Sequence, residues 1–485
     1  MNPQIVKLFG VVLVLYALLF GFTSYWSIFD AEGLEANTAN KRPLLEEQRI
    51  DRGDILAADG SPIATSEPRG EGDNRIFVRD YPEGDLYGNP IGYSFVERGR
   101  VGFELDHNDE LVGNKTEFLS ILDELRGQPQ EGSDVQSSLD PEAQETALDA
   151  LGGQRGSVVA MVPSTGEIKA MVSVPTYDPN DVPDAFEELN QNQNAPLFNR
   201  ATQAGYQPGS TMKVVTATAA LDSGEFDPDT TLSGENGKVI SGVPLNNAGG
   251  EAFGEIDMTT ALTNSVNTWW AEVGEKLGTD TMYKYMDRFG FNEQPPLDYP
   301  SFQLAESGEF ADGRLLGPDS DQIDVGRMAI GQDKLNVTPL QMAMIVSAVA
   351  NDGELMEPRL WSKVIDTDGR EEKLEPERMS RVMSEDTAST LTTMMTDVVN
   401  EGTGGAAALA DDQVAGKTGT AEIDIANEIN QAWFIGFAPA DDPEFAVAAT
   451  IERTSGQGGT VAAPIAQQVL EVLLADPAAG DEGDE

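Results

Sequence analysis

An uncharged apolar run near the N-terminus constrains this chain more than any other feature. Residues 8–29 hold no charged side chain, Lys7 precedes them and Asp30 follows them. About 20 apolar residues are enough for a helix to cross a bilayer at ~1.5 Å per residue. A cleaved signal peptide is the alternative, but its apolar core is shorter and a small-residue cleavage site follows it, whereas this run ends in bulky aromatic side chains. We therefore predict that residues 1–30 form a cytoplasmic stub and a retained transmembrane anchor.

The side of the membrane follows from the flanking charge. A basic residue before the run favours an N-terminus on the cytoplasmic side. By our count, no other stretch of the sequence is apolar enough to span a membrane. The prediction is a single-pass protein of the cell membrane with most of its chain outside the cytoplasm.

The rare residue types narrow the chemistry that the chain can perform. It has no cysteine, and His107 is its one histidine. A thiol nucleophile, a disulfide framework and a cysteine-based metal site are therefore excluded. Any imidazole general base would have to be His107. The sequence implies no metal and no cofactor.

The charge is the second unusual property. Acidic side chains number 83 against 31 basic ones, which gives a net charge of −52 spread along the chain. Such a chain is a poor partner for nucleic acid or anionic lipid, since both attract clustered Lys and Arg. A surface of this kind repels itself unless salt screens it. We interpret the charge as that of a protein that works in high salt; an ordinary acidic secreted protein is the alternative.

The part after the anchor divides into two regions of different composition. Residues 31–138 are polar and rich in turns, and they predict a small, mostly β module. A Pro-, Gly- and Gln-containing stretch at residues 128–133 is typical of a linker. Residues 139–476 hold longer apolar runs and predict the larger domain, and residues 477–485 form an acidic tail.

The larger region predicts an α+β fold with an antiparallel sheet. A hairpin at its start and two strands near its end flank a central helical block, and a helix closes the chain. In the smaller region, an Asp-Gly turn predicts a hairpin between residues 52–55 and 59–64. In the larger region, we expect strands at residues 156–162, 167–174, 432–438 and 444–451, and helices at residues 210–221 and 462–474.

Three short motifs carry the chemistry of this sequence. The first is Ser210-Thr211-Met212-Lys213, in which a hydroxyl and an amine lie one helical turn apart on the same face. Lys213 can activate Ser210 as a nucleophile only when burial or a nearby cation lowers the pKa of its amine. The backbone N–H of Ser210, free at a helix N-terminus, can stabilise an oxyanion. Alone, the pattern also fits a helix start with a solvated lysine.

The second motif is Ser265-Val266-Asn267. Ser265 can relay a proton, and Asn267 can bind a substrate amide. An ordinary helix cap uses the same residue types, so this motif carries little weight by itself.

The third motif is Lys417-Thr418-Gly419-Thr420, which precedes an expected strand. Lys417 offers a cation for a carboxylate, Gly419 allows a substrate backbone to approach closely, and Thr420 offers a second backbone donor for the oxyanion. A phosphate-binding loop would need glycine at position 411, where the chain has Asp411. A surface turn with a solvated lysine is the remaining alternative.

Together and in this order, the three motifs resemble the active-site signature of the penicillin-interacting serine enzymes. Other segments resemble the class B penicillin-binding proteins, most of all their actinobacterial A type, over nearly the whole chain after the anchor. Gln207 departs from that pattern, which often has Pro or Glu there. The transpeptidase-like segments are Asn199-Arg200-Ala201-Thr202, Tyr206-Gln207-Pro208-Gly209, Ile330-Gly331-Gln332 and Thr338-Pro339-Leu340-Gln341-Met342, and the module-like segments are Arg52-Gly53-Asp54-Ile55 and Gly102-Phe103-Glu104.

The resemblance implies a serine β-lactamase-like transpeptidase domain that cross-links peptidoglycan stem peptides ending in D-Ala-D-Ala. Ser210 would form an acyl-enzyme, and β-lactams would acylate the same serine. The implied catalytic residues are Ser210, Lys213, Ser265, Asn267 and Lys417, and the implied substrate-binding residues are Thr418, Gly419 and Thr420.

Other functions share these motifs and stay open. A D,D-carboxypeptidase or a β-lactamase-like hydrolase would use the same site, and a non-catalytic scaffold would leave it idle. A β-lactam sensor needs a cytoplasmic signalling part, which residues 1–7 are too short to supply. The N-terminal module is too short for a glycosyltransferase, so the resemblance implies a separate SEDS-type glycosyltransferase as partner.

Overall fold

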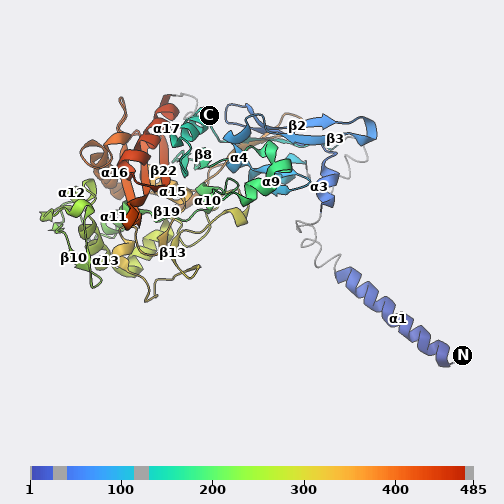
Figure 1. Cartoon of the computed structure of the whole chain (residues 1–485), viewed down its shortest axis with the longest axis horizontal. Coiled ribbons are helices and arrows are strands. Elements are labelled where there is room, and N and C mark those ends of the chain that lie inside the picture. The colour runs from blue at the N-terminus through green and yellow to red at the C-terminus, as the bar shows by residue number, and fades with distance from the viewer. Residues whose placement is uncertain (1–2, 26–40, 114–129, 476–485) are drawn as a thin grey trace.

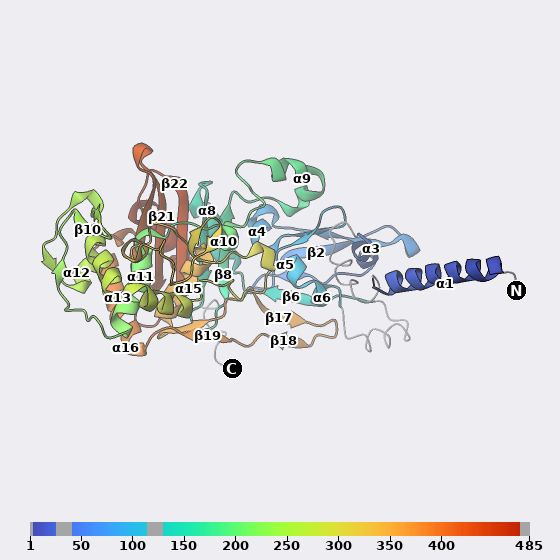
Figure 2. The ribbon, with the colours of Figure 1, turned by 90° about the horizontal axis from the view of Figure 1, so that it is seen from below.

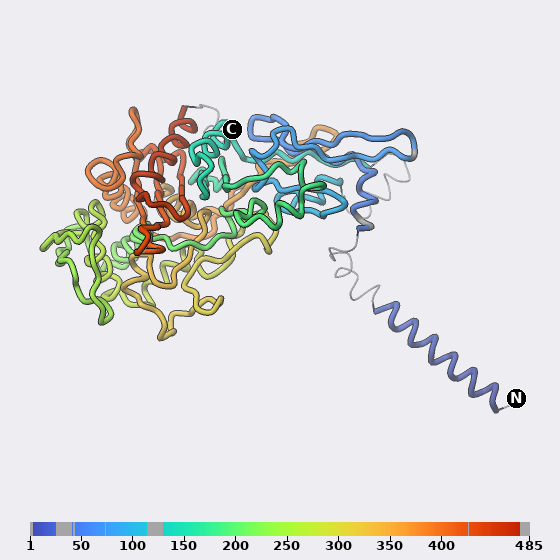
Figure 3. Tube along the Cα trace, in the orientation of Figure 1, coloured from blue at the N-terminus to red at the C-terminus, as the bar shows by residue number. Residues whose placement is uncertain are grey.

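The computed structural model describes residues 3–25, 41–113 and 130–475. The predicted acidic tail, the start of the predicted linker and the end of the apolar run lie outside the described residues. Figure 3 traces the course of the chain from its N-terminal module to its larger domain.

The apolar run forms helix α1, Pro3–Ser24, none of whose residues is buried. This helix is long and apolar enough to cross a membrane. A second stretch, Gly458–Ala475, passes the same test of length and composition, so the prediction that no other stretch would do so was wrong. Its helix α17, Ala463–Ala475, packs against the sheet of the larger domain, which explains its apolar composition without a membrane.

The N-terminal module is built on a six-stranded sheet. The predicted hairpin around the Asp-Gly turn is present, with Gly60 at φ +83° and Ala57 N–H donating to Ser61 O at 2.8 Å. Two strands from much later in the chain complete the sheet, next to the strand at residues 134–137 (Figure 2). The strands run in the order β18 (Glu371–Lys373), β17 (Trp361–Ile365), β6 (Asp134–Ser137), β1 (Ile55–Leu56), β2 (Pro62–Arg69) and β3 (Ile76–Asp80).

A buried carboxylate ties this module together. Glu104 is fully buried; its oxygens accept hydrogen bonds from Arg52 Nη2 at 2.7 Å, Arg79 Nε at 2.5 Å and Tyr81 OH at 3.0 Å. Burial opposes the charge of Glu104, but the two guanidinium groups outweigh it and lower the pKa of the carboxyl to about 2. The two module-like segments of the sequence therefore meet in one ionic cluster.

The larger domain contains a five-stranded antiparallel sheet. Its first hairpin is buried on both faces: Val158 and Ala160 pack under one helical layer, and Val159 and Met161 under the other. This explains why the two strands read as continuous apolar runs rather than as an alternating pattern. The strand order is β20 (Ala415–Asp424), β21 (Ile429–Ala438), β22 (Phe445–Thr454), β7 (Gly156–Met161) and β8 (Ile168–Val174).

Helices cover both faces of this sheet (Figure 1). On one face lie α8, Pro141–Leu151, and α17. On the other lies α15, Pro339–Ala350, whose residues are all buried and whose first turn is capped by Thr338. Helices α11, Lys213–Asp222, and α16, Glu385–Asn400, pack beside α15. The predicted α+β architecture with an antiparallel sheet is confirmed.

The remaining elements are short, apart from the 22-residue helix α13. Other helices are α3 (Arg42–Glu47), α4 (Gly88–Ile91), α5 (Phe103–Asp106), α6 (Asn108–Leu111), α9 (Val182–Gln191), α10 (Arg200–Gln203), α12 (Met258–Thr263), α13 (Asn267–Arg288) and α14 (Val325–Met328). Other strands are β4 (Tyr93–Phe95), β5 (Gly99–Val101), β9 (Leu232–Ser233), β10 (Lys238–Ile240), β11 (Val243–Leu245), β12 (Glu255–Ile256), β13 (Gly308–Ala311), β14 (Arg314–Leu315), β15 (Leu335–Asn336), β16 (Glu354–Met356) and β19 (Arg378–Arg381).

Candidate active site

Ser210 lies in a tight turn that enters the buried helix α11. The sequence predicts a helix from residue 210, but Gly209–Met212 form a 3₁₀ turn and the α-helix begins at Lys213. Gly209 N–H donates to Gly331 O at 2.9 Å, and a Cβ on Gly331 would lie only 2.0 Å from Gly209 O. The nucleophile loop, residues 206–210, is therefore fixed against the backbone of a second segment.

Lys213 is the centre of the assembled motifs. Its Nζ lies 2.9 Å from Ser210 Oγ, 2.7 Å from Asn267 Oδ1 and 3.1 Å from Ser265 Oγ. The side chain is fully buried, and burial, followed by the nearby cation of Lys417, holds the pKa of its amine well below the usual value. These are the conditions under which a lysine amine can take a proton from a hydroxyl.

Ser265 stands between the two lysines. It adopts φ +56° in the turn between α12 and α13, a left-handed conformation that few serines adopt. Lys417 Nζ lies 3.0 Å from its Oγ. Burial lowers the pKa of Lys417 to about 7. A hydroxyl in contact with two amines of lowered pKa is placed to pass protons between them.

Asn267, the other end of the second motif, serves the base directly. Its Oδ1 accepts from Lys213 and its Nδ2 donates to Asn246 O at 3.2 Å. The contact with a substrate amide expected from the sequence stays a prediction.

The third motif lies on β20, an edge strand of the five-stranded sheet. Thr418 Oγ1 is 2.6 Å from Thr403 Oγ1, and Gly458 N–H donates to Thr420 Oγ1 at 3.1 Å. A Cβ on Gly419 would lie 2.6 Å from Pro208 O. Gly419 thus makes room for the nucleophile loop inside the protein, which is a different need from the close approach of a substrate that the sequence suggested.

An ionic group behind the nucleophile loop escaped the sequence analysis. Glu452 on β22 accepts from Arg200 Nε at 2.8 Å and from Tyr206 OH, and Arg155 Nε lies 3.3 Å from its other oxygen. Arg200 and Tyr206 belong to segments that carry the family resemblance, but their partner lies about 250 residues away, and nothing in the local sequence indicates it.

The one histidine is not part of this site. His107 is buried in the N-terminal module, with its ring centre 4.1 Å from that of Phe103 and 5.3 Å from that of Trp361. Burial lowers its pKa to about 4, so the ring is neutral at neutral pH. The ring of His107 packs between two aromatic rings. In the assembled motifs, the candidate general base is therefore a lysine.

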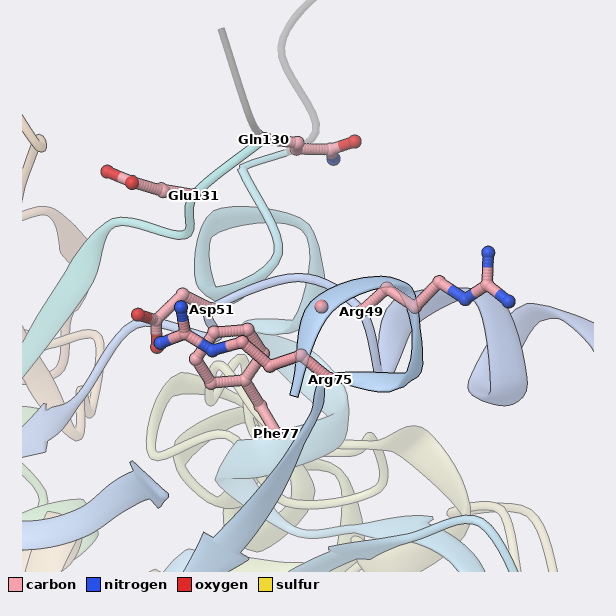
Figure 4. Close-up of a pocket in the computed structure, with 7 residues that line it drawn as sticks. Arg49, Asp51, Arg75, Phe77, Gln130 and Glu131 are labelled. Carbon is pink, nitrogen blue, oxygen red and sulfur yellow. The ribbon is translucent and has the colours of Figure 1, made fainter. Parts of the chain in front are cut away.

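A pocket of about 510 Å³ also opens in the N-terminal module. Figure 4 shows Arg75 between Asp51 and Phe77, with its guanidinium carbon 4.8 Å from the centre of the Phe77 ring. None of the predicted site residues lines this pocket, which therefore has no part in the chemistry of Ser210. Its lining residues are Arg49, Asp51, Gly72, Arg75, Phe77, Gln130 and Glu131.

Comparison with known proteins accounts for both regions of the chain. The model of the penicillin binding protein transpeptidase domain matches residues 156–471. The model of the penicillin binding protein A dimerisation domain matches residues 52–135. Neither matched model is a glycosyltransferase.

Relatives match along almost the full length. The chain is 35% identical to the peptidoglycan D,D-transpeptidase PbpA of Mycolicibacterium smegmatis, over 98% of this chain and 99% of that protein. It is 32% identical to PbpA of Mycobacterium tuberculosis over the same shares.

Solved structures match equally well. The ceftriaxone acyl-enzyme complex of penicillin-binding protein A from M. tuberculosis has a TM-score of 0.79 at 30% identity, covering 90% of this chain and 100% of that one. The D,D-transpeptidase domain of a peptidoglycan glycosyltransferase from Eggerthella lenta has a TM-score of 0.76 at 32% identity, covering 88% and 99%. The chain therefore belongs to the class B penicillin-binding proteins.

Proposed function

We propose that this protein is a peptidoglycan D,D-transpeptidase that works through an acyl-enzyme on Ser210. The observation that carries the proposal is the buried amine of Lys213, 2.9 Å from Ser210 Oγ. An amine with a lowered pKa at that distance is a suitable base for the hydroxyl. Relatives that match nearly the whole chain are named for this activity.

In the acylation step, Ser210 Oγ attacks the carbonyl carbon of the D-Ala-D-Ala peptide bond while Lys213 Nζ takes its proton. The C–N bond breaks, and the amine of the terminal D-Ala leaves with a proton that Lys417 supplies through Ser265. In the second step, an amine of a neighbouring stem peptide attacks the ester carbonyl and gives up a proton, which returns to Lys417 through Ser265. The ester C–O bond breaks, and Ser210 Oγ takes back its proton from Lys213. The balance of the two steps is one peptide bond lost and one formed.

The third motif holds the substrate in this proposal. Lys417, Thr418 and Thr420 offer a cation and two hydroxyls to the terminal carboxylate. The backbone N–H groups of Ser210 and Thr420 stabilise the oxyanion. The support is that Gly209 packs directly on the Thr420 backbone, where a Cβ on Gly209 would lie 3.0 Å from Thr420 C.

β-Lactams resemble the D-Ala-D-Ala peptide and acylate the same serine in this proposal. Solved acyl-enzyme complexes of M. tuberculosis penicillin-binding protein A with ceftriaxone, imipenem and penicillin G support it. Ser210→Ala is expected to abolish covalent labelling by a fluorescent penicillin while the melting temperature stays within a few degrees. The control is Ser223→Ala, in the same helical region, which should label normally. Labelling of Ser210→Ala would place the nucleophile elsewhere.

Transpeptidation and D,D-carboxypeptidation differ only in whether an amine or water resolves the acyl-enzyme. Incubation with a stem pentapeptide donor and an acceptor peptide, followed by mass analysis, distinguishes cross-linked dimer from free tetrapeptide. The dimer is expected. Tetrapeptide as the only product would identify a carboxypeptidase, and rapid release of hydrolysed penicillin would identify a β-lactamase-like hydrolase.

The placement and partners of the protein complete the proposal. Helix α1 anchors the chain in the cell membrane, and the catalytic domain lies outside the cytoplasm. Residues 31–138 act as a pedestal for a transpeptidase domain at residues 139–476, and a SEDS-type glycosyltransferase supplies the glycan strands. The apolar helix that precedes the module supports the anchor, and the match of residues 52–135 to a dimerisation domain supports the separate N-terminal module. The SEDS-type partner rests on the family resemblance alone.

A further inference from the structure

A buried carboxyl group outside the catalytic motifs lies behind the nucleophile loop. Glu309, on β13, has no exposed surface. Among the described residues, neither of its carboxyl oxygens has a hydrogen-bond partner. A buried charge without a partner is strongly unfavourable, whereas a neutral carboxylic acid can be accommodated.

Three charged groups and one phenol lie close enough to Glu309 to interact with it electrostatically. Asp333 and Lys334 come from the segment before β15, Asp324 precedes α14, and Tyr283 comes from α13. Burial raises the pKa of Glu309 to about 8, with Asp333 and Asp324 adding to the rise and Lys334 opposing it. Lys334 is already bound to Asp333 Oδ2 and Gln322 O, so it does not neutralise Glu309 in this arrangement.

The segment next to Glu309, residues 331–335, also supports the nucleophile loop. Glu309 pairs with Leu335 in the sheet register, and the N–H of its neighbour Phe310 donates to Lys334 O at 3.1 Å. Gln207 Nε2 donates to Asp333 O at 2.8 Å, and Gly331 O accepts from Gly209 N–H at 2.9 Å. The same short segment therefore pairs with the strand that carries the buried carboxyl and also contacts the residues before Ser210.

We propose that Glu309 is a positioning residue that supports the nucleophile loop only in its protonated form, so that its ionisation lowers acylation at alkaline pH. The inference rests on Ser210 as the nucleophile. An ionised Glu309 attracts water or the amine of Lys334, which now binds Asp333 Oδ2 and Gln322 O, and in this proposal residues 333–334 shift in response. A Cβ on Gly331 would collide with the Gly209 backbone, so the two backbone segments are packed in close contact. A shift of residues 333–334 therefore presses on the nucleophile loop. The nucleophile loop must move with it.

The sign of the pH effect follows from the raised pKa. Glu309 is protonated in the folded protein and ionised in the unfolded chain between pH 4.5 and about 8. Stability from this group is complete below the unfolded pKa and is lost progressively as pH rises through that window. At pH 9, about one folded molecule in ten would keep Glu309 protonated, by the definition of a pKa near 8.

The test compares wild type with Glu309→Gln, which keeps the shape and cannot ionise. The second-order rate of labelling by fluorescent penicillin and the melting temperature are measured from pH 6 to pH 9.5. Labelling by the two proteins is expected to be equal at pH 6, and wild type is expected to be about tenfold slower at pH 9. Its melting temperature should fall below that of Glu309→Gln over the same range. At each pH, the wild-type labelling rate is divided by the rate of Glu309→Gln. Because both proteins contain Lys213 and Lys417, this ratio removes the effect of the titration of these two lysines.

The control is Glu306→Gln, an exposed carboxyl three positions earlier, whose pH profile should follow wild type. A rate ratio that stays flat while both proteins label normally would overturn the coupling alone. Absence of labelling at every pH would count against Ser210 and the coupling alike. Should Glu309→Gln fail to fold, Lys334→Met removes the nearby cation and is expected to move the alkaline fall to higher pH; an unchanged midpoint would overturn the proposal.

Discussion

Ser265 connects the protonation states of the two lysines in the active site. Its Oγ lies 3.1 Å from Lys213 Nζ and 3.0 Å from Lys417 Nζ, and its left-handed backbone presents it to both. Two buried amines this close to one hydroxyl disfavour a second positive charge. Burial lowers the pKa of both lysines, and the nearby cation of Lys417 lowers that of Lys213 further, so that in the proposed mechanism one lysine acts as the base while the other keeps its proton.

The role of Lys213 as the base can be tested by removing its amine. Lys213→Ala removes the base from Ser210, and general-base contributions of about 10²–10⁴-fold lead us to expect a fall of that size in the rate of penicillin labelling. Lys276→Ala, on the exposed side of α13, is the matched control and should label at the wild-type rate. An unchanged rate in Lys213→Ala would show that another group activates the serine.

The charge of Glu104 is expected to stabilise the N-terminal module against unfolding. Glu104→Gln leaves Arg52 and Arg79 buried without a counter-charge, which we expect to cost about 3–5 kcal/mol at pH 7. Because the folded pKa of Glu104 is lowered to about 2, its contribution is present above pH 4.5 and is lost as pH falls through 2. Urea unfolding of the variant and of the exposed control Glu97→Gln, at pH 7 and pH 3, measures this. A variant as stable as wild type at pH 7 would contradict it.

Single-residue features differ in how well a sequence reveals them. The three catalytic motifs could be recognised because each is short and their order is specific. The contacts of Glu452 and the surroundings of Glu309 could not, because each brings together residues that lie far apart in the sequence. For Gly419 the structure adds a reason that the sequence does not show, the close approach of Pro208 O, and the approach of a substrate backbone stays a prediction.

At the scale of elements, the nucleophile loop packs so closely on residues 331–335 that one added side-chain atom at this contact is expected to displace Ser210. Gly331→Ala would place a Cβ 2.0 Å from Gly209 O at a residue with φ +75°. Displacement of a reacting group by about 1 Å can cost about 100-fold in rate, and we expect a loss of that order in penicillin labelling.

Gly313→Ala is a matched control, because Gly313 has φ +73° but nothing within 4 Å of the added Cβ. It carries the same backbone strain without the collision, so it should lower the melting temperature slightly and label at the wild-type rate. Equal labelling by both variants would show that the contact does not position Ser210.

Local patterns predicted four strands and two helices of the larger domain, and most of its shorter elements were not predicted. The hairpin at residues 156–174 and the late strands were predicted within a few residues, because turn residues flank strongly apolar runs. The 3₁₀ turn at Ser210 was missed, since it is set by the packing of Gly209 on Gly331. The pairing of β17 with β6 was also missed, because a sequence carries no local sign of a partner strand more than 200 residues away.

At the scale of the whole molecule, we expect the membrane anchor to be dispensable for acylation of Ser210. Helix α1 has no buried residue, so deletion of residues 1–30 is expected to give a soluble protein that labels with penicillin at the rate of the full chain in detergent. The comparison of the two labelling rates measures this. A truncated protein that folds but does not label would show that the anchor helps to shape the site.

The charge of the whole molecule makes a prediction about salt. With 83 acidic and 31 basic groups, repulsion acts over a Debye length of about 10 Å at 0.1 M salt and about 3 Å at 1 M. Salt should relieve this repulsion more in the compact state than in the expanded unfolded chain. The anchorless protein is expected to melt at a higher temperature in molar KCl than in dilute buffer, with labelling retained. A melting temperature that is flat or falls with salt would remove the case for a saline habitat.

The pairing of β17 with β6 sets the order in which the protein can be assembled as the chain emerges. Strand β6 is complete at residue 137, but its outer neighbour spans Trp361–Ile365. When the chain emerges from its N-terminal end, one edge of β6 therefore stays unpaired until more than 200 further residues have emerged. An unpaired strand edge is a site of aggregation. The module cannot mature as an independent unit, and we expect the half-built sheet to be the species that periplasmic or extracellular folding factors protect.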